Sequence, residues 1–113
     1  MSYNKYKNKK TIIDGHVFSS KKEAQRYQYL KSCVADKSIR DLKLQPIFML
    51  QEGFDHAGKK IKPLTYVADF YYYNTITGQF VIEDCKGWRT EVYKIKRKLF
   101  LKLLKPDEVF LET

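Results

Sequence analysis

Two segments rich in β-branched and aromatic residues, 64–73 and 79–86, are separated by a short turn at 74–78 that ends in glycine. Such segments favour β-strands, and so short a connection makes the two strands antiparallel neighbours. An acidic residue interrupts each segment, Asp69 in the first and Asp84 in the second. The chain is therefore expected to form a sheet that holds two carboxylates close together, if the register of this hairpin allows it.

The N-terminal part of the chain predicts a hairpin followed by a helix. Residues 11–18 consist of two short apolar runs around an Asp-Gly pair, which is typical of tight hairpin turns. Ser20 and Glu23 have the spacing of a capping box, in which a serine and a glutamate each accept a hydrogen bond from the other's backbone amide. A helix is therefore expected from this point to about residue 35, with periodic apolar positions on one side.

The remaining elements follow the same kind of pattern. A strand is expected at 47–50 and a loop at 52–62, and Thr90 can cap a second helix that ends before Pro106. A last short strand is expected at 109–111. The apolar positions that follow helical spacing in the second helix are Val92, Ile95, Leu99 and Leu103. The order of hairpin, helix, three strands, helix and strand indicates an α/β or α+β fold with a mixed central sheet.

Composition limits the class of protein. The 113 residues suffice for one domain, expected at 11–113, behind a basic N-terminal arm at 1–10. There are 22 basic and 13 acidic residues, a net charge of +9, which favours an anionic polymer as the partner. No apolar run is long enough to cross a membrane, and two cysteines fit a reducing cytoplasm. Because histidine and cysteine are scarce, carboxylates would have to hold any metal, which favours Mg²⁺ or Mn²⁺.

The acidic residues of the two strands predict a metal site. Two neighbouring carboxylates repel each other unless a cation lies between them, so Asp69 and Asp84 together indicate a magnesium site. Lys86 is two residues beyond Asp84 and shares its strand face, where its charge can orient a water or stabilise a phosphate. Glu23, on the first turn of the helix, is a further candidate ligand. Glu83 belongs to the opposite face and ranks below Asp84, although a β-bulge would exchange the two.

Basic and aromatic residues near the C-terminus are candidate DNA contacts. Lysines and arginines on one face of the second helix can follow a phosphate backbone, but basic residues late in a helix also favour its dipole. Trp88 can stack on a substrate strand or pack within the protein. The candidate contacts in this region are Trp88, Arg89, Lys94, Arg97, Lys98 and Lys102.

The spacing of the acidic residues resembles a known signature. Asp69, fourteen intervening residues and then Asp84-x-Lys86 are similar to the active-site motif of the PD-(D/E)xK nuclease superfamily, with Ala68 at the position of the motif's proline. The wider pattern resembles a family of small bacteriophage and prophage proteins, labelled as of unknown function and placed in that superfamily. The segments that carry this resemblance are Asn4-Lys5-Tyr6, Asp14-Gly15, Phe18-x-Ser20-x-x-Glu23-Ala24, Leu42-x-x-Gln45-Pro46, Tyr66-x-Ala68-Asp69-Phe70 and Glu83-Asp84-x-Lys86-Gly87.

The resemblance implies a restriction-endonuclease-like α-β-β-β-α-β core and an Mg²⁺-dependent phosphodiesterase, with Mn²⁺ as a substitute. It implies a DNA endonuclease of phage DNA recombination, repair or replication. The sequence leaves the substrate open between branched DNA such as a Holliday junction or a flap, linear duplex, single strands and RNA. Glu23 would be the helix carboxylate, Asp69 and Asp84 the metal ligands and Lys86 the catalytic lysine. Gln45 would be an auxiliary polar group near the site.

Two other functions fit the same sequence. One is a non-catalytic nucleic-acid-binding protein on the same fold, and the other is an inhibitor or scaffold that binds a host protein. A catalytic protein of this size would hold one active site, so cutting both strands symmetrically would call for a homodimer. In all three cases the expected location is the cytoplasm of a bacterial host.

Overall fold

The computed structural model describes residues 10–85 and 89–113, and this part of the chain is a mixed α+β fold with two helices and ten strands. The helices are α1 (Lys21–Ala35) and α2 (Glu91–Leu103). The strands are β1 (Thr11–Ile13), β2 (His16–Phe18), β3 (Ile39–Leu44), β4 (Ile47–Gln51), β5 (Phe54–His56), β6 (Lys59–Ile61), β7 (Leu64–Val67), β8 (Phe70–Asn74), β9 (Gln79–Asp84) and β10 (Glu108–Glu112).

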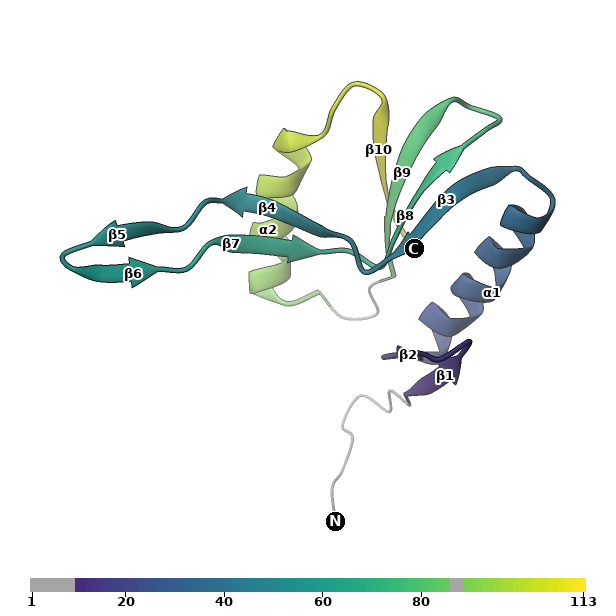
Figure 1. The fold of residues 1–113 in the computed structure, drawn as a ribbon, viewed down its shortest axis with the longest axis horizontal. Helices are drawn as coiled ribbons and strands as arrows, with labels where there is room; N and C mark the ends of the chain where they lie inside the picture. Colours follow the sequence, from purple (N-terminus) through teal and green to yellow (C-terminus); the bar gives the residue numbers. More distant parts are fainter. Residues whose placement is uncertain (1–9, 86–88) are drawn as a thin grey trace, which may run out of the picture.

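A four-stranded mixed sheet forms the centre of the molecule. Its strand order is β10-β9-β8-β3, with β10 parallel to β9 and the other pairs antiparallel. The two helices cover opposite faces of the sheet (Figure 1). Along the chain, the helices and sheet strands follow the order α1, β3, β8, β9, α2 and β10. The predicted mixed sheet, the N-terminal hairpin and both helices are therefore confirmed.

One long antiparallel ribbon connects the central sheet to the far end of the molecule. The pairs β3–β8, β4–β7 and β5–β6 follow one another along it, and the ribbon extends away from the sheet towards β5 and β6 (Figure 1). It bends between the first two pairs, where the Gln45 amide donates to the Asp69 carbonyl (2.9 Å) and the Ala68 amide to the Pro46 carbonyl (3.1 Å). These two bonds continue the ladder through the bend, so the ribbon is continuous.

The ribbon corrects two predictions about the middle of the chain. The expected loop at 52–62 is wrong, since β5 and β6 form a hairpin there around Ala57 and Gly58, whose φ angles are +48° and +78°. Alanine seldom adopts this left-handed conformation, so the turn gave no sequence signal. The predicted strand at 64–73 is divided into β7 and β8 by the bend.

The sequence also predicted the wrong segment as the first strand of the central sheet. The apolar run at 47–50 does form a strand, β4, but β4 pairs with β7 outside the central sheet. Residues 39–44, where the sequence predicted no strand, are the edge strand β3. This strand alternates charged and apolar residues and contains a bulge at Asp41, where φ is +56°. Charged side chains and bulges are common on edge strands, which hides them from a search for apolar runs.

The two faces of the sheet have separate cores. Under α1 the core includes Phe18, Tyr27, Leu30 and Phe70. Tyr27 and Leu30 are at periodic apolar positions of that helix, but Val34, the next such position, is 41% exposed and Cys33 is buried instead. Under α2 the core is aromatic, because Phe100 packs against the rings of Phe48 and Tyr66 with centroids 4.8 and 5.0 Å apart. The helical positions of α2 that are buried are Tyr93 and Phe100.

The apolar stripe of α2 is exposed, which corrects the expected orientation of this helix. Val92, Ile95, Leu99 and Leu103 all have exposed side chains. The face of the sheet under α2 is lined with aromatic rings. The two aromatic residues of α2 fill the space between helix and sheet better than the shorter aliphatic residues would. Helical spacing alone does not distinguish these two apolar faces of one helix.

No helix in the described part of the chain is long and apolar enough to cross a membrane.

Helix α1 offers a matched pair of substitutions that tests the core under it. Leu30 is 1% exposed, whereas Val34, one turn later, is 41% exposed. We expect Leu30→Ala to lower the free energy of unfolding by about 2–5 kcal/mol, because it leaves a cavity in the core. Val34→Ala should change it by less than about 1 kcal/mol. Urea denaturation followed by circular dichroism measures both, and equal losses would contradict this packing of α1.

Candidate metal and nucleic-acid site

Asp69 lies at the bend of the ribbon, where three backbone contacts fix it. Its carbonyl accepts from the Gln45 amide, and its own amide donates to the Glu83 carbonyl (2.9 Å). Its Oδ2 accepts a hydrogen bond from the Cys85 amide (2.6 Å). Gln45 has φ of +50° and precedes Pro46, and these two residues make the bend on the facing strand. The bend therefore ties the Asp69 carboxylate to the end of β9 and places Gln45 beside it.

Glu23 reaches the same place from α1. Ser20 caps this helix, since its Oγ accepts from the Glu23 amide (3.1 Å), and the Glu23 carboxylate accepts from Ser19 Oγ (2.9 Å). The Glu23 side chain is 5% exposed although it is on the first turn of the helix. It lines a cavity of about 210 Å³ whose other polar residues are His16, Gln45 and Asp69. Two carboxylates that are 46 residues apart in sequence thus converge on one cavity.

The Cys85 thiol reports on the electrostatics of this region. Burial raises its pKa, and the negative charges of Asp69, Glu83 and Glu23 raise it further. The hydrogen bond that the thiol sulfur accepts from Thr113 Oγ1 acts in the opposite direction without reversing the shift. Acidic side chains are therefore concentrated at this end of the sheet, and the thiol stays protonated at neutral pH.

Asp84 lies beside Asp69 in register, but its side chain has different surroundings. The antiparallel pairing of Phe70 with Glu83 brings the next residues, Asp69 and Asp84, level with each other. The Asp84 carboxylate is fully buried and accepts a hydrogen bond from the hydroxyl of Tyr66, which belongs to the aromatic core under α2. Burial and this hydrogen bond strongly raise the pKa of Tyr66, so its hydroxyl remains a donor.

Glu83 points to the other face of the sheet, as strand parity predicts. Its two carboxylate oxygens accept from Arg26 Nε (2.7 Å) and Nη2 (2.8 Å), and one of them also accepts from the Tyr72 hydroxyl. Glu83 is fully buried, so this bidentate contact compensates its charge inside the core. Nothing in the sequence pointed to Arg26, because its partner is 57 residues away along the chain. Glu83 therefore has a structural role that separates it from Asp84.

Among the residues expected to contact DNA, the arginines form or approach ion pairs within the protein and the lysines of α2 are exposed. Lys86 and Trp88 lie outside the described residues. Arg97 forms an ion pair with Glu112 (2.8 Å), and Arg89 Nε lies 3.9 Å from the same carboxylate, so both arginines approach the C-terminal strand β10. The lysines of α2 that are exposed on one face of the helix are Lys94, Lys98 and Lys102.

The residues of the cavity have the chemistry that a hard cation prefers. Glu23 and Asp69 supply carboxylate oxygens and Gln45 an amide oxygen, whereas Mg²⁺ in enzymes is often bound by one or two carboxylates together with water and phosphate. Within residues 10–85 and 89–113, no three His, Cys, Asp or Glu side chains are grouped closely enough to hold a metal ion. The side chains of this cavity that could hold a cation, with water and phosphate as its other ligands, are those of Glu23 and Asp69.

The chain belongs to the DUF1064 family, a protein family of unknown function, whose model matches residues 3–109. No curated protein and no solved structure matches the chain.

The ion pair between Arg26 and Glu83 provides a test of the buried charge. We expect Arg26→Ala to lower the free energy of unfolding by about 3 kcal/mol, because it leaves the carboxylate of Glu83 buried without its cation. Arg40→Ala is the matched control, since Arg40 is 65% exposed and pairs with the exposed Asp41 across 3.7 Å. This change should cost less than about 1 kcal/mol. Chemical denaturation of both variants at pH 7 measures the difference, and a loss below 1 kcal/mol for Arg26→Ala would contradict it.

Proposed function

We propose that this protein is a divalent-metal-dependent DNA endonuclease of phage or prophage DNA metabolism, with branched DNA among its substrates. One observation carries the proposal. Glu23 and Asp69 come from different elements and line one cavity together with Gln45, and the sequence resemblance singles out these same three residues. A pair of carboxylates is suited to binding a cation, and a net charge of +9 is suited to attracting the phosphodiester backbone on which that cation would act.

The order of the elements supports the same class of protein. Helix α1, strands β3, β8 and β9, helix α2 and strand β10 follow the α-β-β-β-α-β order expected of a restriction-endonuclease-like core. The segment from β4 to β7 would then be an insertion between the first two strands of that core. In this arrangement Asp69 directly precedes β8 and Asp84 ends β9, which are the strands that carry the metal ligands in the proposed site.

The proposed roles follow from the chemistry of each side chain. A bound Mg²⁺ would polarise the phosphate and lower the pKa of a bound water. Glu23 and Asp69 would hold the cation from two sides of the cavity, and Asp84 would be the second strand ligand, with its Oδ2 held by Tyr66. Lys86 would stabilise the charge that develops on the phosphate.

A non-catalytic nucleic-acid-binding protein on the same fold is the second candidate. The bond between Asp84 and Tyr66 favours it, because that bond turns one proposed ligand towards the core under α2. Both candidates bind DNA, so cleavage distinguishes them.

The test is a cleavage assay on labelled linear duplex, flap, four-way junction and single-stranded DNA. We expect cleavage with Mg²⁺ and Mn²⁺ that EDTA abolishes. Asp69→Asn should be inactive but should still bind DNA, because asparagine keeps an acceptor for the Cys85 amide and loses the charge that holds the cation. Asp55→Asn, in the exposed strand β5, is the matched control and should keep full activity. Salt-dependent DNA binding without cleavage under any metal would favour the second candidate.

Glu23→Gln separates the structural role of this residue from its proposed catalytic role. Glutamine keeps an acceptor for Ser19 Oγ, so the melting temperature should stay nearly unchanged. Cleavage should fall at least ~10-fold, about 1.4 kcal/mol of transition-state stabilisation, because the negative charge is lost. Glu52→Gln, at an exposed position between β4 and β5, is the matched control and should be as active as the unsubstituted chain. Unchanged cleavage by Glu23→Gln would leave Glu23 with a structural role alone.

A further inference from the structure

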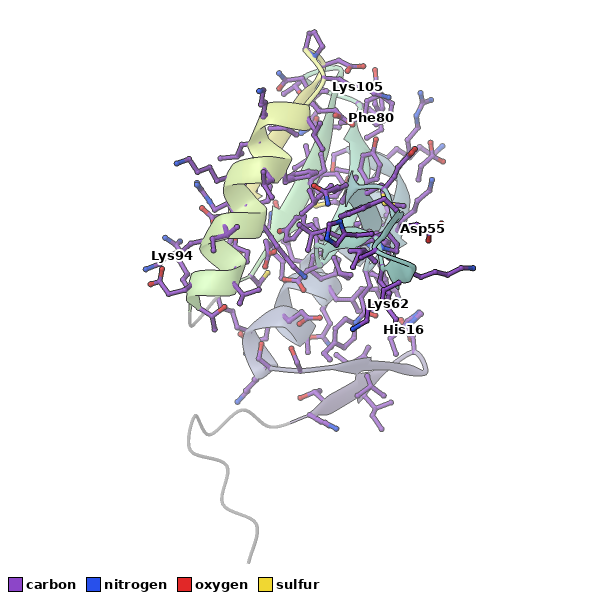
Figure 2. All side chains as sticks on the ribbon, turned by 90° about the vertical axis from the view of Figure 1, so that its left-hand side faces the viewer. His16, Asp55, Lys62, Phe80, Lys94 and Lys105 are labelled. Atoms are coloured by element: carbon purple, nitrogen blue, oxygen red, sulfur yellow. The ribbon has the colours of Figure 1, made fainter. Side chains whose placement is uncertain are left out.

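Helix α2 has three distinct faces. Tyr93 and Phe100 face the sheet and are 7% and 3% exposed. A basic face carries Lys94, Lys98 and Lys102, and Figure 2 shows Lys94 projecting away from the sheet. Residues three or four apart share a helix face, so the third face is also continuous. We call it the aliphatic stripe, and it consists of Val92, Ile95, Leu99 and Leu103.

The side chains of the aliphatic stripe are apolar but lie exposed to solvent. Its side chains are 61%, 59%, 44% and 52% exposed, in sequence order. Single exposed apolar residues are ordinary, but four along one side of a helix mark a contact surface. They are spaced three, four and four residues apart, which is the spacing by which two packed helices interlock. The stripe is therefore suited to packing against another helix.

The chemistry of the aliphatic stripe excludes DNA as its occupant. Aliphatic side chains donate no hydrogen bond to a phosphate or a base edge, and the lysines that can contact phosphates are on the neighbouring face. A protein helix with apolar residues at the same spacing can pack against the stripe and bury its side chains. The stripe itself, on a second copy of this chain, has that spacing and length.

We propose that α2 packs antiparallel against α2 of a second copy through the aliphatic stripe. In this arrangement Val92 lies opposite Leu103 of the second copy and Ile95 opposite its Leu99, because both pairs are centred near Arg97. Every aliphatic residue of the stripe then has an aliphatic partner. The contact is isologous: both copies use the same surface, and the contact closes on itself. It therefore produces a dimer and does not extend into a filament.

Charge favours the antiparallel direction. Glu91 has an 85% exposed side chain at the start of the helix, on the same side of the stripe as Lys102 near its end. Antiparallel packing brings Glu91 of each copy beside Lys102 of the other, and it also aligns the two helix dipoles favourably. Parallel packing would bring the two Glu91 residues level with each other at one end and the two Lys102 residues level at the other, so neither Glu91 could reach Lys102 of the second copy.

The same arrangement places the basic faces of the two copies on one side of the dimer. Lys94, Lys98 and Lys102 of both helices then form a single basic surface, whose repulsion should decrease as salt is added. The stripe offers on the order of 400 Å² per copy, half of the ~800 Å² that each partner buries in a standard interface. We therefore expect a weak, reversible dimer.

Sedimentation velocity of the full chain at rising concentration tests association independently of DNA cleavage. We expect the mass to rise from 13.5 kDa towards twice that value. Ile95→Glu should stay monomeric while its circular dichroism spectrum is unchanged, because Ile95 is 59% exposed. Ile76→Glu is the matched control, at an 80% exposed position after β8, and should still dimerise. A chain that stays at 13.5 kDa up to the highest soluble concentration would overturn the proposal, as would a monomeric Ile76→Glu.

Oxidative cross-linking tests the direction of packing and does not depend on how Ile95→Glu folds. Val92→Cys and Leu103→Cys are prepared as separate proteins, and the unsubstituted chain gives the background from Cys33 and Cys85. Antiparallel packing predicts a cross-linked dimer when the two variants are mixed and background levels when each is oxidised alone. Cross-linking of each variant alone, or no cross-linking of the mixture, would overturn the proposed arrangement.

Discussion

The bend of the long ribbon is the constraint on which the rest of the structure depends. Two backbone hydrogen bonds, from Gln45 to Asp69 and from Ala68 to Pro46, continue the ladder while the ribbon changes direction. On one side of the bend, β3 and β8 join the central sheet, and on the other, β4 and β7 pack on α2. Because Asp69 lies at this point, its carboxylate is placed by two strand pairs and by the end of β9.

Two acidic residues at the end of β9 are buried, and each has its own hydrogen-bond donors. Glu83 and Asp84 are adjacent and both fully buried, but they face opposite sides of the sheet. Arg26 and Tyr72 compensate Glu83 on the side of α1, and Tyr66 holds Asp84 on the side of α2. Buried carboxylates are costly without such partners, so the two cores are built around hydrogen-bond donors as well as apolar rings. The cavity of Glu23 and Asp69 lies on the α1 side of this arrangement.

Local signals explain which parts of the fold could be predicted. The Asp-Gly turn before β2, the serine cap of α1 and the threonine cap of α2 depend on neighbours within four residues, and each was located correctly. Alanine rarely adopts the left-handed conformation of Ala57, and the bulge at Asp41 interrupts an edge strand rich in charged residues, so the strands around these positions were missed. In the site, the positions of the acidic residues in the two strands indicated Asp69 and Asp84, and the family resemblance supported Glu23 as a further candidate. The structure brings Asp69 and Glu23 to one cavity, while Asp84 contacts Tyr66. Arg26 could not be found, because its partner is 57 residues away.

Residue type and short-range spacing are sufficient to predict the two helices, the hairpin of β8 and β9, the basic charge of the chain and the acidic positions of the candidate site. Packing between elements selects which face of α2 is buried, since both its aromatic and its aliphatic residues follow helical spacing and the aromatic rings of the sheet favour the first. Packing also decides that Asp84 contacts Tyr66 and that Asp69 shares a cavity with Glu23. Those contacts follow from how the ribbon bends and how the helices pack across the sheet, over distances in sequence that local pattern does not encode.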